Sequence, residues 1–219
     1  MASDTKSIIY TAVFVILFTF LTVMRAWFRI TTGAYRDGIT SRREGWRLVI
    51  IRWIFGIPLF AFVAMYIGFP GHAGWSYIPL PTPVRFAGVI ISCAALYTIL
   101  LVHRELGRCF SSSLVIRTDH RLVRTGPYGL VRHPMYSAYL LLFIGAFFIS
   151  ENWVIGVTGT AVIVTLMTLR IVREEELLCE RFGDEYEQYR RSTGMFIPLR
   201  RTLLERRTAK ASSETYTPH

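Results

Sequence analysis

The chain has 219 residues, and 52% of them are hydrophobic, above the roughly 45–50% expected of an ordinary soluble domain. Its net charge is +10, and the arginines cluster between long apolar runs. This pattern favours a membrane protein whose orientation is set by charge, and it disfavours nucleic acid as a partner because no recognition motif accompanies the charge.

Five apolar segments approach the length of about 20 residues that a helix needs to cross a bilayer. They are residues 8–27, 48–69, 86–102, 135–149 and 153–169. Only Ser150, Glu151 and Asn152 separate the last two, so we expect a tight helical hairpin there. The sequence therefore predicts an all-α integral membrane protein with about five transmembrane helices, a long cytoplasmic loop and a C-terminal helix.

Basic residues alternate with these segments along the chain. The first and third connections and the C-terminal tail carry many arginines, whereas the second connection, residues 70–84, has no Lys or Arg. The hairpin tip carries only the acidic Glu151. By the positive-inside rule, we expect the N-terminus outside and the C-terminus in the cytoplasm.

The sequence does not indicate a metal site. The three cysteines, Cys93, Cys109 and Cys179, are isolated from one another, so we expect neither a metal site nor a disulfide framework. A non-enzymatic membrane protein or a transporter stays open as an alternative. Transporters, however, usually contain internal repeats, and this sequence has none that we can detect.

The third connection, from His103 to Pro134, is long for a link between membrane helices, and such loops are usually functional or disordered. Gly126-Pro127 indicates a turn. Pro134 suits the first turn of the next helix, where a missing N–H costs nothing. Arg132 and His133 then lie at the N-terminus of that helix, close to the membrane face.

A helix N-terminus favours a carboxylate, because its first N–H groups lack helical partners and its dipole is positive there. Tyr128 and Tyr136 can offer aromatic faces to a cation, which is worth about 0.5–2 kcal/mol. A ligand with both a carboxylate and a sulfonium would suit this place. The simpler alternative is that Arg132 and His133 are interfacial charges beside a capped helix.

A second charged segment follows the last apolar run. Arg170 and Glu174 are four residues apart and share a helix face, which also fits an ordinary ion pair on a solvated surface. Charges near the hydrocarbon edge, however, tend to face a polar cavity. Phe182-Gly183 should end this helix. Asp184 and Glu187 should begin a short helix as a capping pair, with Tyr186 and Tyr189 projecting back toward the bundle.

Taken together, these motifs resemble a known family. The motifs are Gly126-Pro127-Tyr128, Arg132-His133-Pro134 with Tyr136, Glu174-Glu175, and Phe182-Gly183 with Tyr186 and Tyr189, ending at Pro198. They are similar to those of the isoprenylcysteine carboxyl methyltransferases and the related phospholipid N-methyltransferases. The resemblance covers roughly residues 103–198. It implies a membrane enzyme that uses S-adenosylmethionine in a cytoplasmic pocket and lacks a Rossmann fold, and the sequence indeed has no GxGxxG motif.

The resemblance also implies roles for individual residues. The implied cofactor contacts are His120, Arg121, Leu122, Val123, Tyr128, Arg132, His133, Pro134, Met135, Tyr136 and Glu174. Arg170, Glu174 and Glu175 are the implied catalytic residues, and Arg170 would bind the substrate carboxylate. In this interpretation residues 1–102 form N-terminal membrane helices, 103–198 the catalytic region, and 199–219 a basic tail that we expect to be disordered.

The expected reaction is carboxyl O-methylation of a lipophilic, isoprenylcysteine-like acceptor within a lipid membrane. A phospholipid or small-molecule N- or S-methyltransferase is the alternative, and in that case Glu174 or Glu175 could serve as a base. A lipid reductase that binds NADPH is a further alternative, because some membrane sterol reductases share a related C-terminal architecture.

Overall fold

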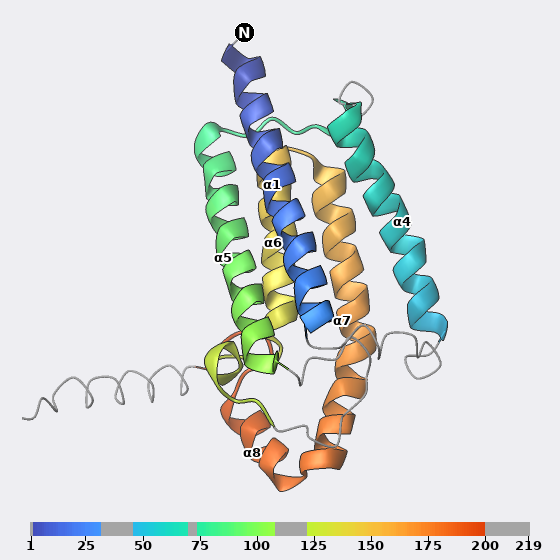
Figure 1. Ribbon diagram of the computed structural model, residues 1–219, viewed down its shortest axis with the longest axis vertical. Coiled ribbons are helices and arrows are strands. Elements are labelled where there is room, and N and C mark those ends of the chain that lie inside the picture. Colours follow the sequence, from blue (N-terminus) through green and yellow to red (C-terminus); the bar gives the residue numbers. More distant parts are fainter. Residues whose placement is uncertain (1, 32–45, 70–73, 108–121, 200–219) are drawn as a thin grey trace, which may run out of the picture.

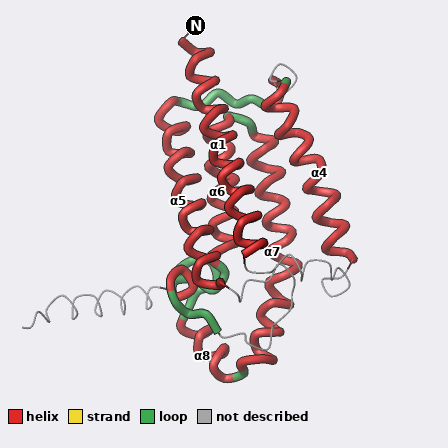
Figure 2. The backbone as a smooth tube through the Cα atoms, viewed as in Figure 1, coloured by secondary structure: helices red, strands yellow, loops and turns green. Residues whose placement is uncertain are grey.

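The computed structural model describes residues 2–31, 46–69, 74–107 and 122–199, and this part of the chain consists of helices and connecting loops (Figure 1, Figure 2). The helices are α1 (Ala2–Thr31), α4 (Trp46–Gly68), α5 (Thr82–Leu106), the short 3-10 helix η3 (Gly126–Gly129), α6 (Pro134–Ser150), α7 (Trp153–Phe182) and α8 (Asp184–Ser192). The long helices stand side by side as a bundle, with η3 and α8 at one end (Figure 1). The predicted all-α class is confirmed.

The helices of the bundle are apolar enough for a bilayer. Within the described residues, three are long enough to cross a membrane: Ser7–Thr31, Thr82–Leu106 and Trp153–Phe182. Two shorter apolar helices, Trp53–Gly68 and Pro134–Ser150, stand beside them. Each of the five apolar runs in the sequence coincides with one of these helices, and the chain is a multi-pass membrane protein.

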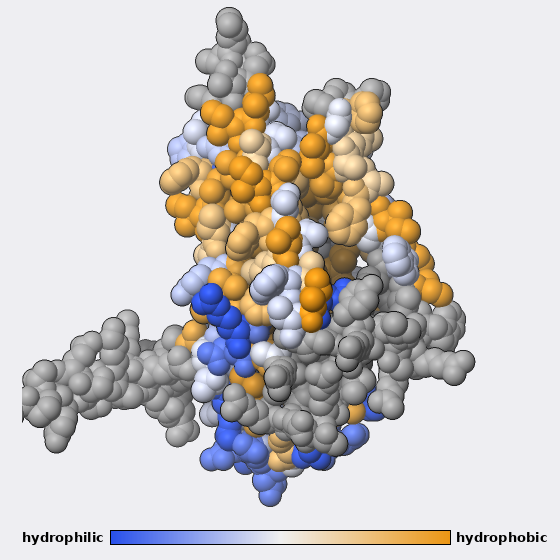
Figure 3. Space-filling view, viewed as in Figure 1, coloured by the Kyte–Doolittle hydropathy of each residue, from blue (hydrophilic) through white to orange (hydrophobic). Residues whose placement is uncertain are grey.

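Helix α7 is longer than a membrane span requires. Its 30 residues correspond to about 45 Å, whereas the hydrocarbon core of a bilayer is about 30 Å thick. Its last turns therefore lie beyond the apolar part of the bundle. The surface changes accordingly, from hydrophobic over the bundle to hydrophilic around α8 (Figure 3).

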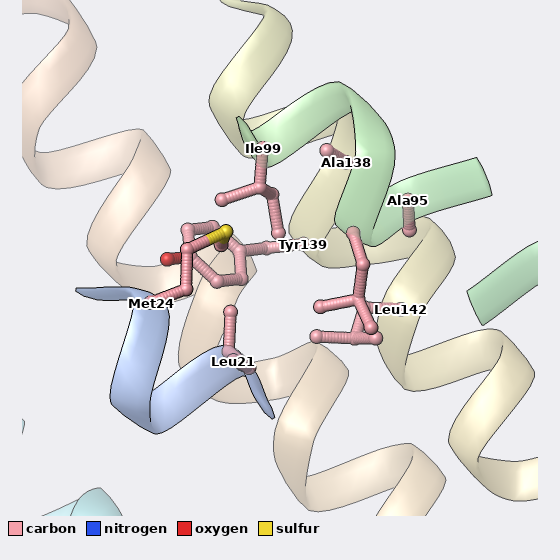
Figure 4. Close-up of a cluster of buried hydrophobic side chains, with 8 residues drawn as sticks. Leu21, Met24, Ala95, Ile99, Ala138, Tyr139 and Leu142 are labelled. Carbon is pink, nitrogen blue, oxygen red and sulfur yellow. The ribbon is translucent and has the colours of Figure 1, made fainter. Parts of the chain in front are cut away.

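Helices α5 and α6 approach each other closely through small residues. A Cβ atom at Gly145 would lie 2.2 Å from the Ser92 hydroxyl oxygen and 2.8 Å from the Gly88 carbonyl oxygen. Small residues permit this approach between membrane helices, where van der Waals contact is a main source of association. A buried cluster on α1, α5 and α6 continues the packing (Figure 4): Leu21, Met24, Ala95, Leu96, Ile99, Ala138, Tyr139 and Leu142. This packing fixes where α6 begins.

The predicted hairpin between α6 and α7 is confirmed. Glu151 adopts a left-handed conformation with φ of 54° and closes α6. Asn152 caps α7, because its side-chain oxygen accepts a hydrogen bond from Ile155 N at 3.2 Å. The Asn152 amide also donates to Ser76 Oγ at 2.6 Å, and both residues are buried.

The start of α8 differs from the prediction. Gly183 ends α7 with φ of 49° and is at the same time the N-cap of α8. No residue with a capping side chain stands between the two helices, and α8 has no side-chain cap hydrogen bond. The predicted capping pair of Asp184 and Glu187 is therefore wrong. Residues 200–219 of the predicted tail lie outside the described residues.

Candidate active site

Charged and aromatic side chains gather where α7 leaves the apolar bundle. We define the junction cluster as Arg132, His133, Tyr136, Arg170, Glu174 and Glu175. Three of these residues come from the start of α6 and three from the second half of α7. Three of them contact one another and are largely shielded from solvent. The side chains of His133, Arg132 and Glu175 are 7%, 10% and 14% exposed.

His133 lies between the two neighbouring carboxylates. Its Nε2 is 3.2 Å from Glu175 Oε1, and its Nδ1 is 3.8 Å from Glu174 Oε2. The residue is the N-cap of α6, and Pro134 follows in the first turn as predicted. One imidazole therefore bridges both acidic positions, and a ring in this place can hold the two carboxylates in a fixed relation.

Glu174 is the more accessible of the two carboxylates. Its Oε1 accepts a hydrogen bond from the Tyr136 hydroxyl at 3.1 Å and lies 3.5 Å from Arg170 Nε. The predicted i,i+4 relation between Arg170 and Glu174 is thus an ion pair. The side chain of Glu174 is 26% exposed, so it can meet a ligand, whereas that of Arg170 is 15% exposed.

Arg132 is engaged by the protein itself. Its Nε donates to Glu175 Oε1 at 3.0 Å. Its Nη1 donates to the carbonyl oxygens of Arg190 and Thr193, each at 2.8 Å. These bonds join the start of α6 to α7 and to the end of α8.

The turn that carries Tyr128 is built on glycine. Gly126 has φ of 57°, a region that only glycine enters readily. A Cβ atom there would also lie 2.7 Å from Glu105 Oε1. The same Glu105 carboxylate accepts a hydrogen bond from Thr125 Oγ1 at 2.6 Å. The end of α5 therefore sets the position of η3.

Tyr128 lies near the junction cluster. Burial raises the pKa of its phenol, and the Glu174 carboxylate raises it further. Its carbonyl oxygen accepts a hydrogen bond from the Tyr189 hydroxyl at 2.6 Å, which links η3 to α8. Burial also raises the pKa of the Tyr186 and Tyr189 phenols. The inward projection predicted for the tyrosines of α8 is confirmed, since both are buried.

The other implied contacts are distributed differently. Met135 packs against the buried cluster of α1, α5 and α6. Leu122 and Val123 are partly buried in the segment that precedes η3. His120 and Arg121 lie outside the described residues.

A cavity of about 740 Å³ lies elsewhere, along the beginning of α1 and the end of α4. Its lining includes Ser7, Thr11, Tyr66, Tyr77 and Asn152, and no residue of the junction cluster. The junction cluster is the candidate site, because among the described residues it is where aromatic, acidic and basic side chains of the predicted motifs meet.

Part of this chain is similar to known proteins. A sequence profile of the isoprenylcysteine carboxyl methyltransferase (ICMT) family matches residues 85–180. The Arabidopsis thaliana protein-S-isoprenylcysteine O-methyltransferase A is 30% identical over 146 residues, which are 65% of this chain and 71% of the relative. The chain belongs to the ICMT family.

Two further matches show how far the likeness extends. The Schizosaccharomyces pombe protein-S-isoprenylcysteine O-methyltransferase is 35% identical over 97 residues, which are 43% of this chain and 41% of that protein. The solved structure of a eukaryotic intramembrane Ras methyltransferase, ICMT, matches with a TM-score of 0.51 and 23% identity, over 67% of this chain and 51% of that one. The latter match shows a shared fold, and several of the curated relatives are matched over only about half of their length.

The ICMT match ends at residue 180, before α8 and the segment that follows it. The sequence places that segment in the catalytic region, but it does not predict the pairing of the segment with the residues before α6. Val131 pairs with Gly194 as a short parallel bridge, and the N–H groups of Arg132 and His133 donate to the carbonyl oxygens of Gly194 and Met195. A single bridge leaves no periodic pattern, so the sequence held no signal that could have found it.

Proposed function

We propose that this protein is a membrane methyltransferase that uses S-adenosylmethionine to methylate the carboxylate of a lipophilic, isoprenylcysteine-like acceptor. The observation that carries the proposal is the junction cluster, in which His133 bridges Glu174 and Glu175 while Tyr136 and Arg170 contact Glu174. The cluster stands at the end of an apolar bundle, where an acceptor with a lipid tail and a charged head would present its head. Family membership supports the same reaction.

The chemistry of the cluster fits this methyl donor. The first turn of α6 offers N–H groups and a positive dipole end to a carboxylate. The neutral rings of Tyr128 and Tyr136 suit a sulfonium, and Glu174 suits an ammonium or hydroxyl groups. We propose the donor contacts named from the sequence for this role, apart from Arg132, whose guanidinium is engaged by protein acceptors. Tyr128, His133, Tyr136 and Glu174 are the central ones.

S-adenosylmethionine, when bound, would supply a methyl group on a positively charged sulfur: an acceptor oxygen would attack the methyl carbon in line, the C–S bond would break, and S-adenosylhomocysteine would leave. An acceptor carboxylate is already ionised at neutral pH, so no general base is required. The work of the protein is to align the acceptor and to exclude water. We assign the orientation of the acceptor carboxylate to Arg170, whose Nε lies 3.5 Å from Glu174 Oε1.

An amine or phenol acceptor would require a base. Glu175 is engaged by Arg132 and His133, whereas Glu174 is more exposed, so Glu174 would take that role. We further propose that the N-terminus lies outside and that the junction cluster and the C-terminus lie in the cytoplasm, in agreement with the distribution of arginines.

The test is a transfer assay on detergent-purified protein with labelled S-adenosylmethionine. The acceptor panel contains a prenylcysteine analogue, a phospholipid amine and a small thiol. We expect label in the prenylcysteine analogue, lost on treatment with base as expected of a methyl ester, and calorimetric binding of S-adenosylhomocysteine.

The other outcomes are equally informative. Label only in the phospholipid amine or the thiol would replace the proposed acceptor. Binding of NADPH without binding of S-adenosylhomocysteine would favour a lipid reductase. A protein that is folded and neither binds S-adenosylhomocysteine nor transfers label would overturn the proposal.

A further inference from the structure

Arg132 belongs to the motif from which donor contacts are inferred, yet its guanidinium faces protein acceptors. The three hydrogen bonds to Glu175 and to the carbonyl oxygens of Arg190 and Thr193 are short and come from two different guanidinium nitrogens. Charge-assisted bonds in a shielded site are strong, and a planar guanidinium gives them fixed directions. An Arg132 held in this way acts on the chain around it.

The chain that it holds is the segment after α8, which we call the C-terminal clasp, residues 193–196. The clasp runs parallel to residues 131–133 through bonds of 2.8 Å from Arg132 N to Gly194 O and 3.0 Å from His133 N to Met195 O. Ser137 Oγ donates to Phe196 O at 3.3 Å. The clasp is therefore attached along the first turn of α6.

The attachment brings one more aromatic ring to the junction cluster. The ring centroid of Phe196 lies 6.2 Å from that of His133, and the ring centroid of Tyr136 lies 5.9 Å from that of His133. Phe196 is only partly buried. A partly exposed aromatic ring beside His133 is suited to a cation or to a stacked heterocycle.

The backbone conformation of the clasp is restricted. A Cβ atom at Gly194 would lie 1.9 Å from the Ile197 carbonyl oxygen, so the chain can fold back there only with glycine. Thr193 is buried, and Tyr189, one turn earlier in α8, is buried as well. The position of Phe196 is thus set by the contacts of Arg132 and Gly194.

We propose that Arg132 is a positioning residue that locks the C-terminal clasp and thereby places Phe196 as an aromatic wall of the methyl-donor site. This inference rests on the proposed function and adds two things to it. Phe196 becomes a direct contact of the donor, and Arg132 acts on donor binding through the clasp instead of through the donor's own carboxylate.

The experiment is a double-mutant cycle with S-adenosylhomocysteine binding measured by calorimetry. The variants are Arg132→Gln, Phe196→Leu and the double substitution, with Arg173→Gln as the matched control, because Arg173 lies exposed on α7 in a pair with Glu176. We expect each single substitution to weaken binding about ten-fold, a loss typical of a removed aromatic or charge-assisted contact. The double variant should bind S-adenosylhomocysteine no more weakly than Arg132→Gln, since in Arg132→Gln the Phe196 ring is already displaced from the donor site.

Additive effects of Arg132→Gln and Phe196→Leu would overturn the proposal, because an Arg132 that touched the donor directly would act independently of Phe196. Arg132→Lys separates the same two possibilities. A lysine keeps the positive charge but has no group at the Nε position to bond Glu175, so we expect it to bind as weakly as Arg132→Gln. Recovery of wild-type affinity by Arg132→Lys would also overturn the proposal.

Steady-state kinetics provide a readout that general destabilisation would not reproduce. We expect Arg132→Gln and Phe196→Leu to raise KM for S-adenosylmethionine and to leave KM for the acceptor within about two-fold. Equal loss toward both substrates would contradict the inference. If Arg132→Gln does not fold, Phe196→Leu still tests the proposal, because this variant retains the main-chain bonds of the clasp. Unchanged donor affinity in Phe196→Leu would show that Phe196 does not contact the donor.

The wild-type protein separates this inference from the function on which it rests. Failure of the wild type to bind S-adenosylhomocysteine would count against the proposed function. Tight binding by the wild type together with unchanged binding by Phe196→Leu would leave the function intact and remove only the role of the clasp.

Discussion

Arg85 Nη1 and Glu151 Oε2 form an ion pair of 2.7 Å at the end of the bundle opposite the junction cluster, with side chains only 8% and 4% exposed. Arg85 also donates to Ile149 O at 3.0 Å, and its guanidinium lies 3.9 Å from the centre of the Tyr10 ring. Glu151 accepts further hydrogen bonds from Leu80 N and from the Tyr77 hydroxyl. One pair therefore ties α1, α5 and the α6–α7 hairpin together.

Removal of one partner of this pair should destabilise the protein strongly. Glu151→Ala leaves the Arg85 charge buried without its carboxylate, a change that typically costs about 3–5 kcal/mol. Thermal unfolding in detergent should show a clear fall in Tm for Glu151→Ala, and a smaller fall for the double variant Arg85→Met with Glu151→Leu. Tyr77→Phe is the control, because it removes one bond to Glu151 and leaves the ion pair in place. An unchanged Tm in Glu151→Ala would mean that the pair does not hold the bundle.

The helices of the bundle could be predicted from the sequence because a bilayer imposes a length and a composition on each of them. The same reasoning predicted the hairpin at Glu151 and the meeting of Arg170 with Glu174, which depend on positions close together in the chain. It did not reveal the pairing of Arg85 with Glu151 or the path of Gly194 beside Val131. These contacts join residues far apart in sequence and repeat at no helical or strand period, so a single sequence carries no sign of them.

The sequence also assigned one role to residues that have different partners in the structure. Arg132 and His133 are neighbours in one motif, but Arg132 bonds to Glu175 and to two carbonyl oxygens while His133 stands between both carboxylates. The α8 start shows the same limit. An acidic pair at Asp184 and Glu187 fits a capping pattern, yet the cap position itself is occupied by Gly183.

The turn before Tyr128 should not tolerate a side chain. Gly126→Ala combines a left-handed φ, which costs roughly 1–2 kcal/mol for a residue with a Cβ, with a clash against the Glu105 carboxylate. We expect a lower Tm and a clear loss of S-adenosylhomocysteine binding. Gly183→Ala is the matched control, since Gly183 has a similar φ of 49° and no atom within 4 Å of the added Cβ. Equal effects of the two substitutions on donor binding would show that contact with Glu105 does not matter.

The orientation of the bundle can be tested with single cysteines. After replacement of the native cysteines by serine, Gly74→Cys and Arg191→Cys report on opposite ends of the bundle, because both positions are exposed. A membrane-impermeant maleimide should label Gly74→Cys on intact cells and Arg191→Cys only after lysis. The reverse labelling pattern would place the junction cluster outside the cell and contradict the proposed topology. The cysteines replaced are Cys93, Cys109 and Cys179.

Two arginines three residues apart on α7 separate acceptor binding from general electrostatics. Arg170 belongs to the junction cluster, whereas Arg173 forms an exposed pair with Glu176 at 3.0 Å. Arg170→Ala should lower kcat/KM for the prenylcysteine acceptor about 10- to 100-fold, as expected when a hydrogen bond to a charged group worth about 1.5–3 kcal/mol is lost. Arg173→Ala should change it less than about two-fold, because an exposed ion pair contributes little.

Binding of S-adenosylhomocysteine distinguishes the possible causes of a lower kcat/KM in Arg170→Ala. Arg170 touches Glu174, so a substitution could act through the donor site instead of on the acceptor. We expect the affinity of Arg170→Ala for S-adenosylhomocysteine to stay within about three-fold of the wild type, less than the energy of one neutral hydrogen bond. A donor affinity that falls as far as kcat/KM would assign Arg170 to the donor site, and the residue that orients the acceptor carboxylate would then have to lie elsewhere in the protein.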